Sequence, residues 1–195
     1  MRTFIAVDIP DGIKQEMAKV QERLRQAGVE AGWTRPEGMH LTLKFLGEVH
    51  ESRLKEIMSA LKIAVSGSGV FRLEIAGAGA FPNARSARVV WIGVGGELDR
   101  LTGLHSAVED AMAGLGFAGE ERTFTPHLTI GRIKLIRSRG RWAAALDEIR
   151  NIRFQGFDVT GVNLMKSELR RSGAIYTEIG RAEFKEEGGA LIMRT

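Results

Sequence analysis

Apolar residues along the chain alternate between the spacing of β-strands and the spacing of α-helices. Residues 2–9 contain Phe4, Ile5 and Val7 and little turn chemistry, which predicts a strand. Helical spacing appears in four segments, whose apolar stripes begin at Ile13, Leu54, Leu98 and Trp142. Further strands are predicted at 70–77, 87–94, 152–159, 161–168 and 174–180. This mixture of elements predicts an α+β fold.

Helix boundaries follow from the residues that cap and end helices. Asp11 and Ser52 are predicted to cap the first two helices, and the third is expected to begin near Glu97. Gly28 is predicted to end the first helix and Gly116 the third. The segments 33–38 and 81–83 are predicted to be loop and turn.

The order of elements in the first half recurs in the second half. His40 lies 29 residues after the helix start at Asp11, and His127 lies 30 residues after the helix start at Glu97. We therefore expect a duplicated unit of about ninety residues, at 11–95 and 97–181. The two units would form one bilobal domain, 1–185, with a pseudo-twofold axis, followed by a flexible tail at 186–195.

A His-Leu-Thr motif occurs once in each half, as His40-Leu41-Thr42 and His127-Leu128-Thr129. Residues i and i+2 of a strand point to the same face, so each motif places an imidazole and a hydroxyl together. The leucines would point into the core. If the halves face each other, the two motifs form one pocket with two imidazoles and two hydroxyls.

Such a pocket suits acid–base chemistry on a phosphodiester. One histidine can take a proton from water while the other gives a proton to the leaving oxygen, and the hydroxyls can bind phosphate oxygens. This scheme needs no metal ion or cofactor, and it predicts a bell-shaped pH dependence. The alternative for each histidine is a purely structural role, but two copies at matching positions favour catalysis. His105 is predicted to pack near the apolar stripe of the helix at 97–115, and His50 is predicted to lie on the surface.

Other chemistries lack their sequence motifs. The chain has no cysteine, which excludes disulfides, thiolate zinc sites and cysteine nucleophiles. Histidine spacings typical of zinc sites, a phosphate-binding loop, a dinucleotide fingerprint and a Gly-x-Ser-x-Gly elbow do not occur. The N-terminus does not resemble a signal peptide and no apolar run could span a bilayer, so a cytoplasmic protein without a membrane partner is expected.

Positive charge is concentrated after the second motif. The net charge is +4 and the sequence pI about 9.7. Residues 132–141 contain five basic residues and no acid: Arg132, Lys134, Arg137, Arg139 and Arg141. A polyanionic substrate is one explanation, and a solvated loop and helix start is the other.

The sequence around both motifs resembles a known family. Residues 40–49, His-Leu-Thr-Leu-Lys-Phe-Leu-Gly-Glu-Val, and residues 125–132, Thr-Pro-His-Leu-Thr-Ile-Gly-Arg, are similar to the two signatures of the 2H phosphoesterases. The likeness is to the branch of RNA 2′,3′-cyclic phosphodiesterases, also called 2′-5′ RNA ligases. It runs from about Arg2 to Arg181. It implies a bilobal α+β fold in which two antiparallel sheets line a central cleft, with helices outside.

The resemblance also implies an activity and the residues that carry it. The reaction is hydrolysis of an RNA 2′,3′-cyclic phosphate end to a 2′-phosphate, with weak reversible 2′-5′ ligation. His40 would be the proton donor, His127 the proton acceptor, and Thr42 and Thr129 would hold the phosphate. The partner would be an RNA end, including a tRNA-derived one. Alternatives are a small cyclic nucleotide, a cyclic phosphate from tRNA splicing, or a non-catalytic RNA-end binding module. A monomer is expected because the duplicated unit completes its own cleft.

Two further residues, Arg132 and Phe45, are candidates for substrate binding. The resemblance associates Arg132 with phosphate binding, and Phe45 could stack on a base. Strict strand alternation would instead place both on the face opposite the motif histidines, where Arg132 is a surface residue and Phe45 a core residue. A bulge at Gly131 would turn Arg132 back toward the site. Tyr176, the only tyrosine, could also line the cleft.

Overall fold

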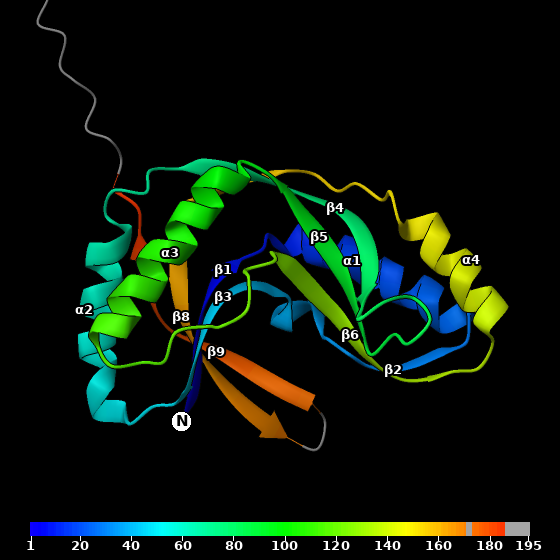
Figure 1. The fold of residues 1–195 in the computed structure, drawn as a ribbon, viewed down its shortest axis with the longest axis horizontal. Coiled ribbons are helices and arrows are strands. Elements are labelled where there is room, and N and C mark those ends of the chain that lie inside the picture. Colours follow the sequence, from blue (N-terminus) through cyan, green and yellow to red (C-terminus); the bar gives the residue numbers. More distant parts are fainter. Residues whose placement is uncertain (171–172, 186–195) are drawn as a thin grey trace, which may run out of the picture.

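The computed structural model describes residues 1–170 and 173–185 (Figure 1). Its helices are α1 (Asp11–Gln26), α2 (Leu54–Val65), α3 (Leu98–Gly114) and α4 (Arg139–Ile149). Its strands are β1 (Arg2–Asp8), β2 (Val29–Trp33), β3 (His40–Glu48), β4 (Phe71–Phe81), β5 (Val89–Gly96), β6 (His127–Ile136), β7 (Phe157–Val159), β8 (Gly161–Arg170) and β9 (Gly173–Glu183). Two short 3-10 turns, Pro36–Gly38 and Glu51–Arg53, precede β3 and α2.

The strands form two antiparallel sheets. The first has four strands in the order β3-β1-β8-β9, and the second has five in the order β2-β6-β5-β4-β7. Every hydrogen-bonded neighbour pair in both sheets is antiparallel. The predicted fold class, α+β with two antiparallel sheets, is confirmed. The first sheet joins β1 and β3, from the start of the chain, to β8 and β9, from its end, so distant parts of the sequence combine in one lobe.

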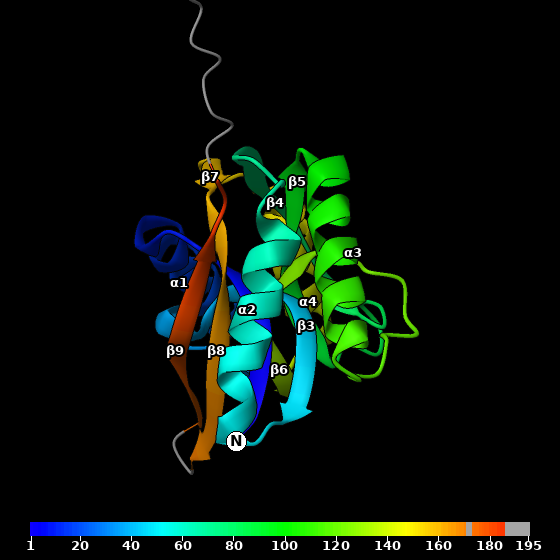
Figure 2. The ribbon, with the colours of Figure 1, turned by 90° about the vertical axis from the view of Figure 1, so that its left-hand side faces the viewer.

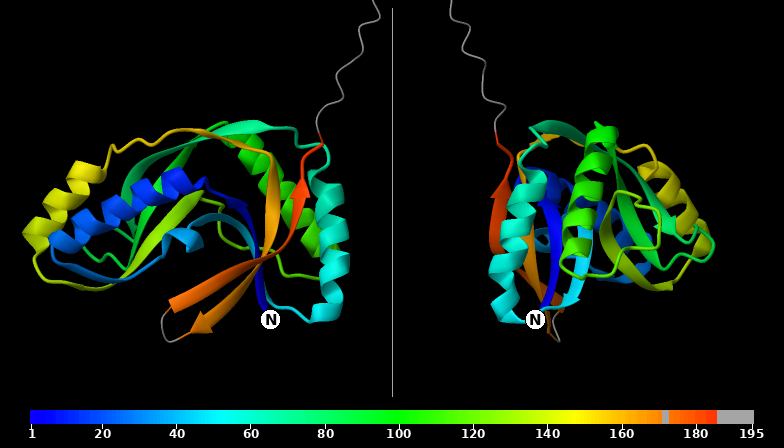
Figure 3. Two further views of the ribbon diagram at one scale, coloured as in Figure 1. Left: turned by 180° about the vertical axis from the view of Figure 1, so that it is seen from behind. Right: turned by 60° about the vertical axis from the view of Figure 1, so that its left-hand side comes forward.

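Each sheet is covered by one helix from the first half of the chain and one from the second half. Helices α2 and α3 pack together along the first sheet, where α3 contacts β3 and α2 contacts β8 and β9 (Figure 2). Helices α1 and α4 pack together along the second sheet, where α1 contacts β2 and β6 and α4 contacts β4 (Figure 3, left). Because α1 follows β1 and α3 follows β5, the two lobes exchange their first helices. This exchange links the lobes into one unit.

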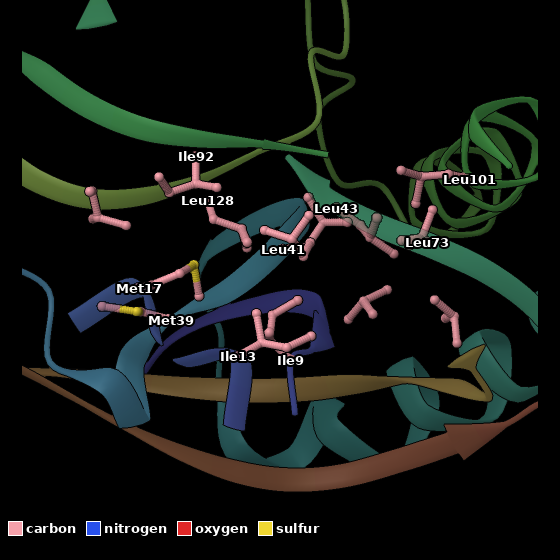
Figure 4. Packing of buried hydrophobic residues seen from close by; sticks show 14 of the residues in the cluster. Ile9, Ile13, Met17, Met39, Leu41, Leu43, Leu73, Ile92, Leu101 and Leu128 are labelled. Atoms are coloured by element: carbon pink, nitrogen blue, oxygen red, sulfur yellow. The ribbon is translucent and has the colours of Figure 1, made fainter. Parts of the chain in front are cut away.

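Both lobes share a hydrophobic core that includes the leucines of the two motifs. Leu41 and Leu128 are fully buried and lie close to Leu43 and Ile92 (Figure 4). The prediction that these leucines point inward is therefore confirmed. Since side chains alternate along a strand, the motif histidines and threonines lie on the faces turned away from this core.

The pairing of the motif strands repeats in the two lobes. In the first lobe Asp8 lies opposite His40 and Ala6 opposite Thr42. In the second lobe Gly93 lies opposite His127 and Trp91 opposite Thr129. A register shift follows immediately after each threonine. The same irregularity at matching positions shows that the halves are structural copies.

The structure corrects both predicted helix caps of the first half. Asp11 is the first residue of α1, and Pro10 occupies the N-cap position without a side-chain hydrogen bond. Asp11 instead lies 3.5 Å from the Lys14 ammonium. Ser52 lies inside the 3-10 turn before α2, where the His50 imidazole accepts a hydrogen bond from its backbone N–H. A histidine cap is not visible in the helical pattern, because His50 lies outside it.

Two strand predictions also differ from the structure. Strand β2 was not predicted, because its five residues, Val-Glu-Ala-Gly-Trp, include a glycine and only one β-branched side chain. The strand predicted at 152–159 is reduced to Phe157–Val159, preceded by a single bridge between Ala76 and Arg153. The predicted tail at 186–195 lies outside the described residues. In the described part of the chain, no helix is long and apolar enough to cross a membrane.

Candidate active site

The two motifs begin the strands that hold the lobes together. His40 is the first residue of β3 and His127 is the first residue of β6, and these strands contact each other. All four motif side chains, His40, Thr42, His127 and Thr129, are partly buried, while the leucine between each pair is fully buried. The two motifs therefore lie on contacting strands, one from each sheet, with their histidines and threonines partly buried.

A bulge follows each motif and changes which side chains share its face. Thr42 lies opposite Ala6 and Phe45 lies opposite Phe4, so Leu43 and Lys44 occupy the space of a single regular residue. Ala6 and Phe4 point to the same face of β1, because they are two residues apart. Phe45 therefore shares the face of Thr42 and His40. The alternative that Phe45 is a core residue is wrong, since 68% of it is exposed.

The second motif is followed by the same irregularity. Thr129 lies opposite Trp91 and Arg132 lies opposite Val89, with Ile130 and Gly131 between them on β6. Arg132 is consequently on the face of His127 and Thr129, and it is exposed. Gly131 is required here because a Cβ atom would lie 2.8 Å from the ring of Trp33. Strict alternation predicted the wrong face for both Phe45 and Arg132.

His40 lies among aromatic rings. Its imidazole is stacked on Phe4 with 4.5 Å between ring centroids, and Tyr176 meets it edge-on at 4.9 Å. Burial lowers the pKa of His40 to about 4, opposed by the negative charge of Asp8 and assisted by the positive charge of Lys14. In the free protein His40 is therefore neutral at neutral pH. Tyr176, from β9, therefore lies beside His40, in keeping with the suggestion from the sequence that it could line the cleft.

His127 has a defined tautomer when it is neutral. Its Nδ1 lies 2.7 Å from the carbonyl oxygen of Thr125. A carbonyl oxygen can only accept a hydrogen bond, so Nδ1 carries the proton and Nε2 has a free lone pair. The ring of Phe81 meets the imidazole edge-on at 5.1 Å. This arrangement orients His127 to accept a proton at Nε2.

Two aromatic neighbours of the motif histidines, Phe4 and Phe81, were missed by sequence reasoning, whereas Tyr176 was already a candidate for the cleft. Phe4 and Tyr176 reach His40 from β1 and β9, and Phe81 reaches His127 from the end of β4. These strands are far from the motifs in sequence. Only strand pairing brings them to the site, and single-residue patterns carry no signal for it.

Most of the basic run after the second motif has structural partners. The Arg137 guanidinium donates to the Glu30 carboxylate. Arg139 and Arg141 donate to the backbone carbonyls of Arg85 and Gln26. Among the described residues Arg132 has no ion-pair partner, so its charge is available to a ligand. The run as a whole is therefore not one continuous anion-binding surface.

The other histidines take the places predicted for them. His105 stacks on Phe124 with 3.9 Å between ring centroids, and burial lowers its pKa. His50 is exposed and bonded to Ser52. Within residues 1–170 and 173–185, no group of three or more histidine, aspartate and glutamate side chains is placed to hold a metal ion.

Comparison with known proteins gives a consistent picture. The family model described as LigT like Phosphoesterase matches the chain twice, at residues 7–91 and 92–176. A protein of Methanothermobacter thermautotrophicus named RNA 2′,3′-cyclic phosphodiesterase is 36% identical over 179 residues, which are 92% of this chain and 96% of that protein. A Thermotoga maritima protein with the same name is 36% identical over 193 residues, 98% of each chain.

Solved structures match over nearly the whole chain. The protein TT0787 of Thermus thermophilus superposes with a TM-score of 0.76 at 28% identity, covering 96% of this chain and 100% of that one. E. coli LigT complexed with 3′-AMP gives a TM-score of 0.76 at 25% identity, covering 95% and 98%. The paired motifs, the duplicated lobes and the double family match agree: the chain belongs to the LigT-like 2H phosphoesterase family.

Proposed function

We propose that this protein hydrolyses RNA 2′,3′-cyclic phosphate ends to 2′-phosphate ends. The observation that carries the proposal is the recurrence of one His-x-Thr face in both lobes, with matching register and in contacting strands. The relatives named RNA 2′,3′-cyclic phosphodiesterase support the choice of substrate. The exposed Phe45 and Arg132 on the same faces supply an aromatic surface for a base and a cation for phosphate.

In the proposed reaction a water molecule attacks the phosphorus atom and the bond to the 3′ oxygen breaks. His127 takes the proton of the water at Nε2, the nitrogen left free by the Thr125 carbonyl. His40 gives a proton to the departing 3′ oxygen. Thr42 and Thr129 donate hydrogen bonds to the non-bridging oxygens. The product keeps the phosphate on the 2′ oxygen, and no metal ion is needed.

The proton on His40 must come with substrate binding. In the free protein burial keeps His40 neutral, with a pKa of about 4. A bound phosphodiester anion favours the charged imidazole and raises its pKa, because opposite charges attract strongly in a partly buried site. His40 would thus become charged only when substrate is present.

Weak 2′-5′ ligation follows from the same geometry. If the 5′-hydroxyl of a second RNA replaces water, the same attack and the same departure of the 3′ oxygen form a 2′-5′ phosphodiester. His127 would take the hydroxyl proton and His40 would again protonate the 3′ oxygen. The reverse reaction would use the two histidines in exchanged roles.

The choice of substrate is tested by comparing the turnover of a cyclic mononucleotide with that of a short RNA ending in a cyclic phosphate, at two salt concentrations. We expect faster turnover of the RNA and a stronger loss of that rate at high salt, because cations of the protein contact its additional phosphates. Equal turnover of both at both salt concentrations would instead indicate a small cyclic phosphate as substrate. Binding of the RNA without product would indicate a binding module.

A further inference from the structure

The two motif histidines differ in the charged residues around them. In the first lobe Asp8 lies opposite His40 on the neighbouring strand. In the second lobe the equivalent position, opposite His127, is Gly93. A side chain is excluded there, because a Cβ on Gly93 would lie 2.6 Å from the carbonyl oxygen of Ala76. Only His40 therefore has a carboxylate opposite it in its strand pair.

A buried lysine fixes the carboxylate of Asp8. The Lys14 ammonium donates to Oδ1 of Asp8 over 2.8 Å, and the Lys14 side chain is only 8% exposed. The same ammonium lies 3.5 Å from Oδ1 of Asp11, whose side chain is 93% exposed. Since a buried ammonium is costly without a partner, the ion pair holds the Asp8 carboxylate in place beside Lys14. Asp8 is thus a fixed negative charge at the start of the first motif.

The groups facing His40 come from three elements. Strand β1 supplies Asp8 and the ring of Phe4, helix α1 supplies Lys14, and β9 supplies the ring edge of Tyr176. The charges of Asp8 and Lys14 act on His40 with opposite signs. On β5 the residue opposite His127 is Gly93, which has no side chain, so that strand offers no such ion pair at this position.

We propose that Asp8, held by Lys14, is a positioning residue that favours protonation of His40 and so makes His40 the acid of the pair. The two His-x-Thr motifs are otherwise nearly symmetric. Asp8 breaks the symmetry on one side, and the Thr125 carbonyl, which leaves Nε2 of His127 unprotonated, breaks it on the other. This inference rests on the proposed function, because only the proposed reaction makes His40 an acid catalyst. The effect of Asp8 on the protonation of His40 can nevertheless be measured without any turnover.

The direct test is a titration of the His40 and His127 imidazoles by NMR in single variants, over the pH range in which circular dichroism shows an intact fold. Asp8→Asn should move the His40 midpoint to lower pH by about 0.5 or more, because it removes a nearby negative charge. Lys14→Gln should move it to higher pH, because it removes a positive charge. The His127 midpoint should stay in place in both variants.

Asp11→Asn is the matched control, because it removes an exposed carboxylate that lies 3.5 Å from the same lysine and should leave the His40 midpoint nearly unchanged. Asp8→Glu should restore most of the wild-type midpoint. A His40 midpoint that is unchanged in Asp8→Asn, or a His127 midpoint that moves as far, would overturn the proposal. If Lys14→Gln does not fold, Asp8→Asn and Asp8→Glu still decide the question.

The kinetic test is turnover of a cyclic-phosphate RNA. Asp8→Asn should lower kcat/KM roughly threefold or more, since a shift of about 0.5 in the midpoint is a factor of three in the charged fraction of His40. Asp8→Glu should recover the rate. If Asp8→Asn lowered the His40 midpoint but kept full turnover, the catalytic role of Asp8 would be overturned. Absence of turnover in the wild type would overturn the proposed function alone.

Discussion

Phe45 and Arg132 occupy equivalent positions in the two lobes. Each lies five residues after a motif histidine, each follows a bulge, and each shares the face of the histidine and threonine before it. One is an exposed aromatic ring and the other an exposed guanidinium. The duplicated scaffold thus carries two different contact groups beside a nearly symmetric acid–base pair.

The first prediction concerns the ring of Phe45. Phe45→Ala should lower kcat/KM for an RNA substrate by roughly fivefold or more, since stacking of a base on an aromatic ring contributes about 1–3 kcal/mol. The free energy of unfolding should change little, because the ring is 68% exposed. Leu135→Ala, at a residue that is 50% exposed near the far end of β6, is the control and should alter neither quantity. Unchanged kinetics in Phe45→Ala would contradict a stacking role.

The second prediction concerns the charge of Arg132. Arg132→Ala should raise KM and reduce the dependence of kcat/KM on salt, because one phosphate contact is removed. Arg132→Lys should recover only part of the affinity, since lysine cannot bind a phosphate with two parallel hydrogen bonds. Measuring kcat/KM at several salt concentrations checks this. An identical salt dependence in wild type and Arg132→Ala would exclude a direct phosphate contact.

The third prediction concerns stability at acid pH. The pKa of His40 is lowered by burial to about 4 in the folded protein, compared with about 6.5 in an unfolded chain. Between these values the unfolded state binds more protons, so the free energy of unfolding decreases as pH falls from about 6.5 to 4, by on the order of 2 kcal/mol after allowance for solvent screening. His40→Asn should show a smaller decrease in urea unfolding over that range. Some decrease remains, because burial also lowers the pKa of His105.

The fourth prediction concerns the buried ion pair between Lys44 and Glu109. The Lys44 ammonium lies 2.6 Å from Oε2 of Glu109, and the other carboxylate oxygen is buried and has no hydrogen-bond partner among the described residues. Lys44→Met should lower the free energy of unfolding by about 3–5 kcal/mol, because it leaves an uncompensated buried charge. The double variant Lys44→Met/Glu109→Leu should recover most of that loss in urea unfolding. If the double variant is no more stable than the single one, charge burial is not the cause.

The fifth prediction concerns the bulge beside Arg132. Gly131→Ala places a methyl group 2.8 Å from the ring of Trp33, so it should lower the free energy of unfolding by about 1–3 kcal/mol. Gly95→Ala, in the neighbouring strand β5, meets nothing within 4 Å and is the matched control. If the two variants had equal free energies of unfolding in urea, the Trp33 ring would not be what excludes a side chain at residue 131.

Much of the fold was predictable because local pattern and tertiary structure agree. The strand at the N-terminus, the four helices and the inward leucines of both motifs all follow from apolar spacing. Strand β2 was missed because its residues have little strand propensity, and it forms by pairing with β6. The exchange of α1 and α3 between lobes depends on long-range packing, which a single sequence does not encode in any local pattern.

The two motifs of the site were predictable from the sequence, which left Phe45, Arg132 and Tyr176 as open candidates beside them. The alternation of strand side chains correctly placed the histidines with their threonines. It failed at Phe45 and Arg132, because a bulge adds one residue and reverses the faces beyond it. The charge of Asp8 and the rings of Phe4, Tyr176 and Phe81 reach the histidines from other strands. The cytoplasmic location, the monomeric state and the unit boundaries at 11–95 and 97–181 stay predictions.

Acid–base catalysis by the two motif histidines is best tested by analysing the product formed from a short RNA with a 2′,3′-cyclic phosphate end in the presence of excess EDTA. We expect an RNA with a 2′-phosphate end, formed at a rate that is reduced by about 10²–10⁴ in His40→Ala and in His127→Ala and unchanged in His50→Ala. A 3′-phosphate product, a requirement for added metal, or full turnover after loss of both motif histidines would contradict it.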